Sequence, residues 1–262
     1  MSVVIEPIIR DTKGISASTT LVDLFKEEHI LMTRPDCYGI DTLGIQVGEE
    51  ILPGRLIVIE GTDGVGRTTQ LRLLRPWLES LGYAVADTEF TRSALAGDGI
   101  RQAKAGHTLG PITMHLFYAT DFVDRLENQV LPALRAGFIV LIDRYIYTLM
   151  ARAMVRGANP HWLRSIYSLA LKPDAIFYLN IGIDDLIPRV LQRGGFNYWE
   201  SGMDMRLGPD LYESFITYQA RLLTQFEHMV KPYEFRVIDA KQPVEDICAQ
   251  LKNAIYPLLP QG

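Results

Sequence analysis

The chain is poor in cysteine and histidine, and each shortage excludes a class of protein. Its 262 residues include two cysteines and five histidines. Cys37 and Cys248 lie far apart and follow no metal-binding or redox spacing, so we expect free thiols and no disulfide framework. None of the histidines forms a cluster with metal-ligand spacing; they are His29, His107, His115, His161 and His228.

Long hydrophobic runs and an excess of positive charge are also absent. No apolar run approaches the roughly 20 residues that a membrane-spanning helix needs. The first residues, MSVVIEPIIRDTKG, lack the basic and then apolar segments of a secretion signal. The formal net charge is −5, whereas a broad nucleic-acid footprint is basic. We therefore expect a cytoplasmic protein that binds neither membranes nor nucleic acid.

The length and the apolar content favour one main domain. With 262 residues, of which 48% are hydrophobic, the chain can bury one substantial core. Residues 1–53 precede the first clear strand and are too few to bury a core of their own. We expect a domain over residues 54–262 and an N-terminal extension of unknown role over residues 1–53.

From residue 55 onward, short apolar runs alternate with stretches of helical periodicity. The strand candidates are residues 56–60, 83–90, 138–143, 175–180 and 235–239. Helices are expected between them, and the longest is expected over about residues 113–136. Such alternation is typical of βαβ units with a buried parallel sheet. The sequence therefore predicts a three-layer α/β sandwich with a central parallel sheet covered by helices on both faces.

A glycine-rich turn joins the first predicted strand to the first predicted helix. It reads GTDGVGRTT over residues 61–69, which is G-x-x-x-x-G-K-[ST] except at the lysine position. Glycines let the backbone approach an anion, and the helix N-terminus adds partial positive charge. The turn is therefore predicted to bind the phosphates of ATP. Its predicted binding residues are Gly61, Asp63, Gly64, Val65, Gly66, Arg67, Thr68 and Thr69.

Arg67, in place of the usual lysine, leaves two interpretations open. Arginine keeps the positive charge and can bond two phosphate oxygens, but it is bulkier and planar. In the first interpretation Arg67 is catalytic in a working phosphotransferase. In the second, the protein is a catalytically impaired nucleotide-binding switch, with its N-terminal extension as the surface that contacts a partner. We favour the first.

Asp143 and Arg144 follow directly on the predicted strand at residues 138–143. In an open parallel sheet, ligands gather at the carboxyl ends of the strands, so both residues are expected beside the glycine-rich turn. Asp143 and Thr68 could hold Mg²⁺, and Arg144 could neutralise transferring phosphoryl oxygens. A structural salt bridge at the strand end is the alternative.

Taken in order, these motifs resemble the thymidylate kinase family. The matching segments are EGTDGVGRTTQ at 60–70, FTR at 90–92, LFYATD at 116–121, PAL at 132–134, DRY at 143–145 and KPDAIFYLNI at 172–181. The resemblance covers about residues 54–257. It implies a P-loop kinase fold, transfer of the ATP γ-phosphoryl group to a nucleoside monophosphate with Mg²⁺, and a homodimer.

The resemblance also implies roles in the acceptor site. Asp63 matches an acid that meets the sugar 3′-hydroxyl, and Arg92 matches an arginine that holds the acceptor phosphate. Tyr118, with its neighbour Phe117 as the alternative, matches an aromatic residue that stacks on the base; both could instead be core residues. Phe122 replaces an arginine that helps to recognise the base and phosphate, so we expect thymidylate to be a poorer acceptor than another monophosphate.

Two further departures from the family pattern lie in the part of the site that is expected to recognise the base. The chain reads SALA over residues 93–96 instead of Glu-Pro-Gly-Gly, and Ala151-Arg152-Ala153 replaces Ala-Tyr-Gln. This part of the site is the least similar to the family. A kinase of a modified nucleotide, or of a modified base or sugar in DNA, is therefore the remaining alternative.

Residues 182–212 are a candidate lid. Asp185, Arg189 and Arg193 are spaced four apart, so a helix would place both arginines on one face before Gly194 and Gly195 end it. A closing lid could supply charge to the transition state. We therefore predict that Arg189 binds ATP and that Arg193 is catalytic. The alternative is a solvated helix face with an Asp185–Arg189 ion pair.

Overall fold

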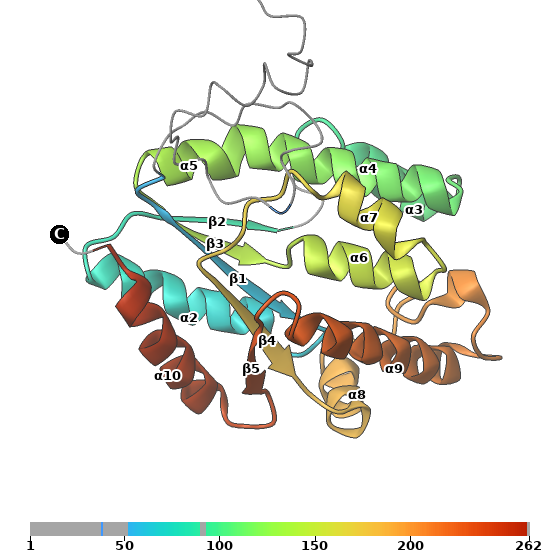
Figure 1. Cartoon of the computed structure of the whole chain (residues 1–262). Coiled ribbons are helices and arrows are strands. Elements are labelled where there is room, and N and C mark those ends of the chain that lie inside the picture. Colours follow the sequence, from blue (N-terminus) through green and yellow to red (C-terminus); the bar gives the residue numbers. More distant parts are fainter. Residues whose placement is uncertain (1–37, 39–51, 90–92, 261–262) are drawn as a thin grey trace, which may run out of the picture.

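The computed structural model describes residues 38, 52–89 and 93–260 of the chain. A five-stranded parallel sheet lies between two layers of helices (Figure 1). The strand order is β2-β3-β1-β4-β5. The strands are β1 (Arg55–Gly61), β2 (Val85–Glu89), β3 (Ile139–Asp143), β4 (Ala175–Asn180) and β5 (Arg236–Asp239). The predicted three-layer α/β fold is confirmed.

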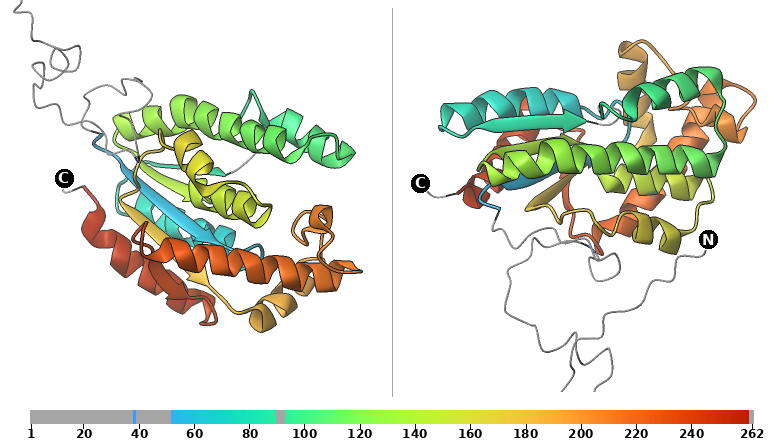
Figure 2. Two further views of the ribbon diagram at one scale, coloured as in Figure 1. Left: turned by 45° about the vertical axis from the view of Figure 1, so that its right-hand side comes forward. Right: turned by 90° about the horizontal axis from the view of Figure 1, so that it is seen from above.

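The helices divide between the two faces of the sheet, as the views in Figures 1 and 2 agree. One face is covered by α2 (Arg67–Ser80), α8 (Ile183–Gln192) and α10 (Val244–Ile255). The other is covered by α4 (Pro111–Arg125), α5 (Leu131–Arg135), α6 (Ile146–Val155), α7 (Pro160–Ile166) and most of α9 (Leu211–Val230). The remaining elements are α3 (Gly97–Gly106) and the short η2 (Leu126–Val130), η3 (Met203–Met205) and η4 (Tyr256–Leu258).

The central strand β1 shows why both faces are covered. Successive side chains of a strand point to opposite faces. Leu56 and Val58 lie in the core beneath α4 and α6, whereas Ile57 and Ile59 lie in the core beneath α2 and α10. All four are buried. The continuous apolar run of this strand therefore serves two cores.

The long helix expected over residues 113–136 is interrupted. It consists of α4, a π-helical turn over η2, and α5. Pro132 lies in the first turn of α5. Because proline has no N–H and its ring clashes with the carbonyl four residues earlier, the regular ladder cannot pass through it. Among the described residues, the longest continuous helix is α9 instead.

The residues predicted as an N-terminal extension lie outside the described residues, apart from Tyr38, Leu52 and Pro53. The Tyr38 hydroxyl is 2.6 Å from the hydroxyl of Tyr147, and its ring packs edge-on against Tyr233. The division into an extension over residues 1–53 and a domain over residues 54–262 stays a prediction. Within the described chain, no helix is long and apolar enough to cross a membrane.

Candidate active site

The glycine-rich loop connects β1 to the first turn of α2. Gly66 is the N-cap of α2, with a left-handed φ of 110° that favours glycine. A Cβ atom added there would meet nothing within 4 Å, so the space in front of the loop is open. No side chain caps this helix, and its first turn contains no acidic residue. Its first amides and its dipole therefore remain available to an anion.

Arg67 joins this loop to the end of β3. The residue is 6% exposed. Its Nε donates to Oδ1 of Asp143 at 2.6 Å, and its Nη1 donates to the carbonyl of Gly61 at 2.5 Å and to that of Thr62. The strands make this possible because β1 and β3 are in register, with Ile59 opposite Asp143. Arg67 thus holds the loop and the strand end together.

Asp143 and Thr68 form an oxygen pair beside the loop. The Thr68 hydroxyl donates to Oδ2 of Asp143 at 2.8 Å. Although burial disfavours the charged form, Arg67 and Arg144 hold the pKa of Asp143 below its ordinary value. In the described chain, no group of three or more His, Cys, Asp or Glu side chains could hold a metal ion. The pair fits Mg²⁺, which keeps water and substrate phosphates among its ligands.

Glu60, at the end of β1, fixes the turn that follows β3. The carboxylate is fully buried and accepts from the backbone N–H of Tyr145 at 2.8 Å and from the Thr148 side chain. Burial raises the pKa of Glu60 above its ordinary value of 4.5. These bonds set the start of α6 against the sheet and so orient the residues further along that helix.

Arg144 lies in the turn that Glu60 fixes, and its φ of 70° is unusual for a residue other than glycine. Such a conformation is commonly kept at functional sites. Its Nη2 pairs with Oδ1 of Asp63, while Nη2 of Arg152 donates to the other oxygen, Oδ2, at 2.6 Å. Burial and the nearby Arg67 lower the pKa of Arg144 to about 10, so it stays charged at neutral pH.

Two buried polar atoms of the described residues beside the loop have no hydrogen-bond partner. They are Nε of Arg144 and Oγ1 of Thr62. An unsatisfied buried group of this kind costs about 1–3 kcal/mol, which a ligand atom could recover. The Arg144 donor in particular suits an anionic oxygen. Because Arg144 also lines a cleft, its unpartnered donor marks a candidate ligand contact.

This cleft has a volume of 450 Å³ and is also lined by Asp143 and Thr68. Its cationic lining residues are Arg67, Arg101, Lys104, Arg144, Arg152 and Arg193, and its anionic ones are Asp63, Glu89, Asp143 and Glu200. Cations outnumber anions, which fits a phosphorylated ligand.

Comparison with known proteins decides the family. Residues 59–251 match the family model for thymidylate kinase. The "Probable thymidylate kinase 2" of Saccharolobus solfataricus is 35% identical over 204 residues, which are 77% of this chain and 95% of the relative. The chain belongs to the thymidylate kinase family.

More distant relatives agree. The "Probable thymidylate kinase" of Pyrococcus abyssi is 28% identical over 216 residues, covering 78% of this chain and 99% of the relative. The "Thymidylate kinase" of Brachyspira hyodysenteriae is 24% identical over 205 residues, covering 78% and 94%. The resemblance drawn from the motifs is confirmed, and family membership supports phosphoryl transfer from ATP to a nucleoside monophosphate.

The cleft of this thymidylate kinase family member brings together seven of the fifteen site residues that the sequence predicts. Asp63, Arg67, Thr68, Tyr118, Asp143, Arg144 and Arg193 all line it. Of the two candidate aromatics, Tyr118 lines the cleft, whereas Phe117 packs beside Gly99 of α3. Arg92 lies outside the described residues.

The structure corrects the prediction that Phe122 contacts the substrate. The Phe122 side chain is 3% exposed and its ring packs edge-on against Tyr145 and Tyr167, with centroids 5.2 and 5.8 Å away. It does not line the cleft, because an apolar ring gains more from burial in this aromatic cluster than from a polar surface. The expectation that thymidylate is a poor acceptor rested on the arginine that Phe122 replaces, and it stays a prediction.

The two arginines of the candidate lid act in different places. Arg189 donates to the carbonyls of Val65 at 3.1 Å and of Ala240 at 2.7 Å, so it ties α8 to the phosphate loop. Arg193 pairs with Glu200, and both line the cleft. The alternative of an Asp185–Arg189 ion pair is wrong.

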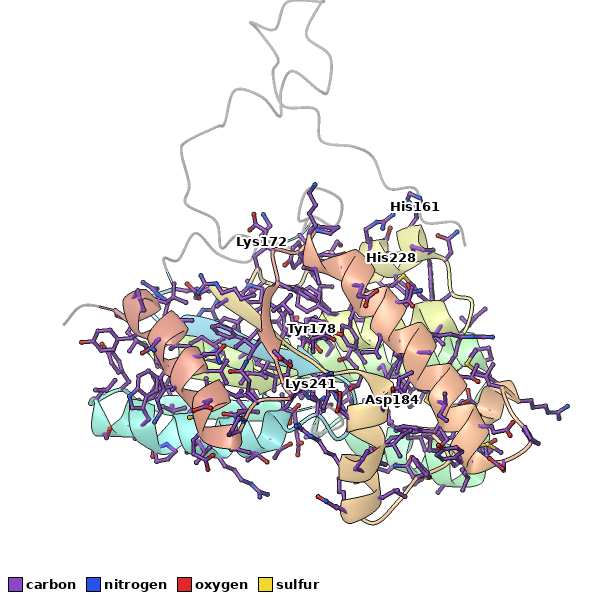
Figure 3. All side chains as sticks on the ribbon, turned by 90° about the horizontal axis from the view of Figure 1, so that it is seen from below. His161, Lys172, Tyr178, Asp184, His228 and Lys241 are labelled. Carbon is purple, nitrogen blue, oxygen red and sulfur yellow. The ribbon has the colours of Figure 1, made fainter. Side chains whose placement is uncertain are left out.

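Asp185 pairs with a lysine instead, at 2.7 Å from Nζ of Lys241. Lys241 lies in the turn after β5, next to the start of α8, as Figure 3 shows for Lys241 and Asp184. The same view places His161 on α7 and His228 on α9, and neither lines the cleft.

Sequence reasoning assigned no role to several residues that line the cleft, among them Lys104 and Arg152. Arg152 had a detectable pattern, since Thr148, Arg152 and Arg156 are spaced four apart on the helix that follows Asp143 and Arg144. That spacing puts them on one face of α6. Lys104 had no such pattern, because α3 reaches the cleft only through tertiary packing.

Proposed function

We propose that this protein is a Mg²⁺-dependent kinase that places the phosphates of ATP on the 61–69 loop and a nucleoside monophosphate in the cleft. The observation that carries the proposal is the buried, unpartnered Nε of Arg144, a residue that lines the same cleft as Asp143 and Thr68. A charged donor without a partner suits an oxygen of the transferring phosphoryl group.

Phosphoryl transfer requires positioning and charge neutralisation more than covalent chemistry by the protein. Arg144 stays charged at neutral pH and faces the cleft. Arg193 adds a cation from the lid side. Arg67 keeps a positive charge within the loop and holds the loop against Asp143. In this proposal the three arginines together replace what a loop lysine provides elsewhere.

The Asp143 carboxylate and the Thr68 hydroxyl would hold Mg²⁺. When bound, the ion neutralises phosphate charge and orients the phosphates. Asp143 is suited to this because its lowered pKa keeps it ionised at neutral pH.

Other features follow from the family resemblance and stay proposals: stacking of Tyr118 on the base, a phosphate contact from Arg92, a homodimer and a cytoplasmic location. Ile112 and Leu116 support an interface on α4, because they are 65% and 46% exposed.

The Arg144→Ala variant tests the proposal. We expect its turnover to fall by about 10²–10³, because its charge acts mainly on the transferring group, while ATP affinity changes little. Turnover is measured at saturating substrates, and ATP affinity by calorimetric titration. Arg221→Ala, an exposed position on α9, is the matched control. A collapse of ATP affinity with normal turnover of the remaining complex would contradict the assignment.

A further inference from the structure

Asp63 lines the cleft, but both oxygens of its carboxylate are occupied by arginine partners. Its side chain is 3% exposed, and each of its carboxylate oxygens bonds a guanidinium, that of Arg144 or of Arg152. The Arg144 and Arg152 side chains are 18% and 20% exposed. At this point the cleft therefore presents mainly the two guanidinium groups, which are more exposed than the carboxylate.

Arg152 has hydrogen-bonding capacity left for a ligand. A guanidinium carries five N–H groups. Among the described residues, its side chain makes one hydrogen bond, the 2.6 Å contact of Nη2 with Asp63. Although burial disfavours the charged form, Asp63 raises the pKa of Arg152 above its ordinary value, so the group is a permanent cation.

Arg152 also lies where the cleft meets a small aromatic recess. A cavity of 40 Å³ adjoins the cleft, and Lys104, Tyr118 and Arg152 line both. The recess is further walled by Trp199 and Tyr218. Arg152 thus faces both the phosphate-binding end, with Arg144, and aromatic rings that suit a base. In a nucleoside monophosphate, the part between phosphate and base is the sugar.

We infer that Arg152 binds the acceptor nucleotide by donating a hydrogen bond to the oxygen of its sugar 3′-hydroxyl, and that Asp63 is a positioning residue that acts through Arg152. The inference rests on the proposed function. It changes the role that the resemblance implies for Asp63, which there meets the hydroxyl itself. It also gives a role to a position where this chain departs from the family.

The test compares two acceptors: the monophosphate that wild-type protein phosphorylates best, and the same nucleotide without its 3′-hydroxyl. We expect the wild type to prefer the hydroxylated acceptor in kcat/KM by about ten- to a hundred-fold, the range of a charge-assisted hydrogen bond. In Arg152→Met the preference should fall close to one. Arg152→Lys should restore part of it. In Asp63→Asn it should shrink but remain above that of Arg152→Met.

ATP affinity is measured for every variant, with Arg221→Met as the matched surface control. An unchanged ATP affinity shows that the loop remains folded. Loss of the preference in Asp63→Asn together with its retention in Arg152→Met would overturn the inference, because the carboxylate would then touch the hydroxyl. A wild type without any preference would also overturn it. Failure of the wild type to phosphorylate any monophosphate would instead contradict the proposed function, so the two failures are distinguishable.

Discussion

Replacing Arg67 by methionine should destabilise the protein far more than replacing an arginine on the surface of the same helix. Arg67 and Asp143 form a buried ion pair, with side chains 6% and 9% exposed. The guanidinium also bonds the carbonyls of Gly61 and Thr62. Removing one partner of a buried pair leaves an uncompensated charge, which costs about 3–5 kcal/mol. We expect the free energy of unfolding of Arg67→Met to fall by this amount at pH 7.

The matched control is Arg75→Met, because Arg75 also lies on α2 and also pairs with carboxylates. Its Nε is 3.0 Å from Glu79, but its side chain is 47% exposed. Exposed ion pairs contribute about 0–1 kcal/mol. Urea unfolding without nucleotide gives both values. A loss in Arg67→Met no larger than that in Arg75→Met would refute the view that Arg67 holds the loop to β3.

The pH dependence provides a second check on the same variant. The folded-state pKa of Asp143 lies below its ordinary value of 3.8, so the pair contributes stability that is present above that value and lost as the pH falls through the lowered pKa. Without Arg67, burial is opposed only by Arg144 and the Thr68 hydroxyl, so we expect the pKa of Asp143 to rise. The deficit of Arg67→Met should therefore be largest at pH 7 and shrink as the pH falls toward 4. A deficit that does not depend on pH would contradict the reasoning.

Three further outcomes are expected. Phe122→Ala should lower the free energy of unfolding by about 3–5 kcal/mol, as for other buried aromatics, and leave the ranking of acceptors unchanged; a changed ranking would mean that Phe122 touches the acceptor. Arg193→Gln should slow turnover with less than about 1 kcal/mol of lost stability, because its pair with Glu200 is partly exposed. Burial raises the folded-state pKa of Glu60 above 4.5, so the stability that Glu60 contributes is present below that pH and lost as the pH rises. Glu60→Gln should therefore lose less stability than the wild type over this range, which unfolding experiments at several pH values measure.

The sheet and the phosphate loop were predictable because their determinants are local in sequence. The apolar run of β1 and the glycines after it specify a buried strand and a tight turn without reference to distant residues. Asp143 and Arg144 could be placed beside the loop because the carboxyl ends of parallel strands meet at one edge.

The helix surfaces were harder to predict, because packing decides which side faces the cleft. Tyr118 and Phe122 lie one turn apart on α4, yet one lines the cleft and the other the aromatic core. Arg152 was passed over because its importance depends on Asp63, which is distant in sequence and meets it only in the folded chain. The partner of Asp185 was missed for the same reason, since Lys241 comes from the turn after β5.

The most direct test is product formation by the full-length wild-type protein. The protein is incubated with ATP, Mg²⁺ and, in turn, dTMP, dUMP, dCMP, UMP and CMP, and the nucleotides are separated by anion-exchange chromatography. We expect ADP and the matching nucleoside diphosphate to appear in equal amounts with at least one acceptor. Calorimetric binding of ATP without diphosphate formation from any acceptor would contradict the kinase and favour the nucleotide-binding switch.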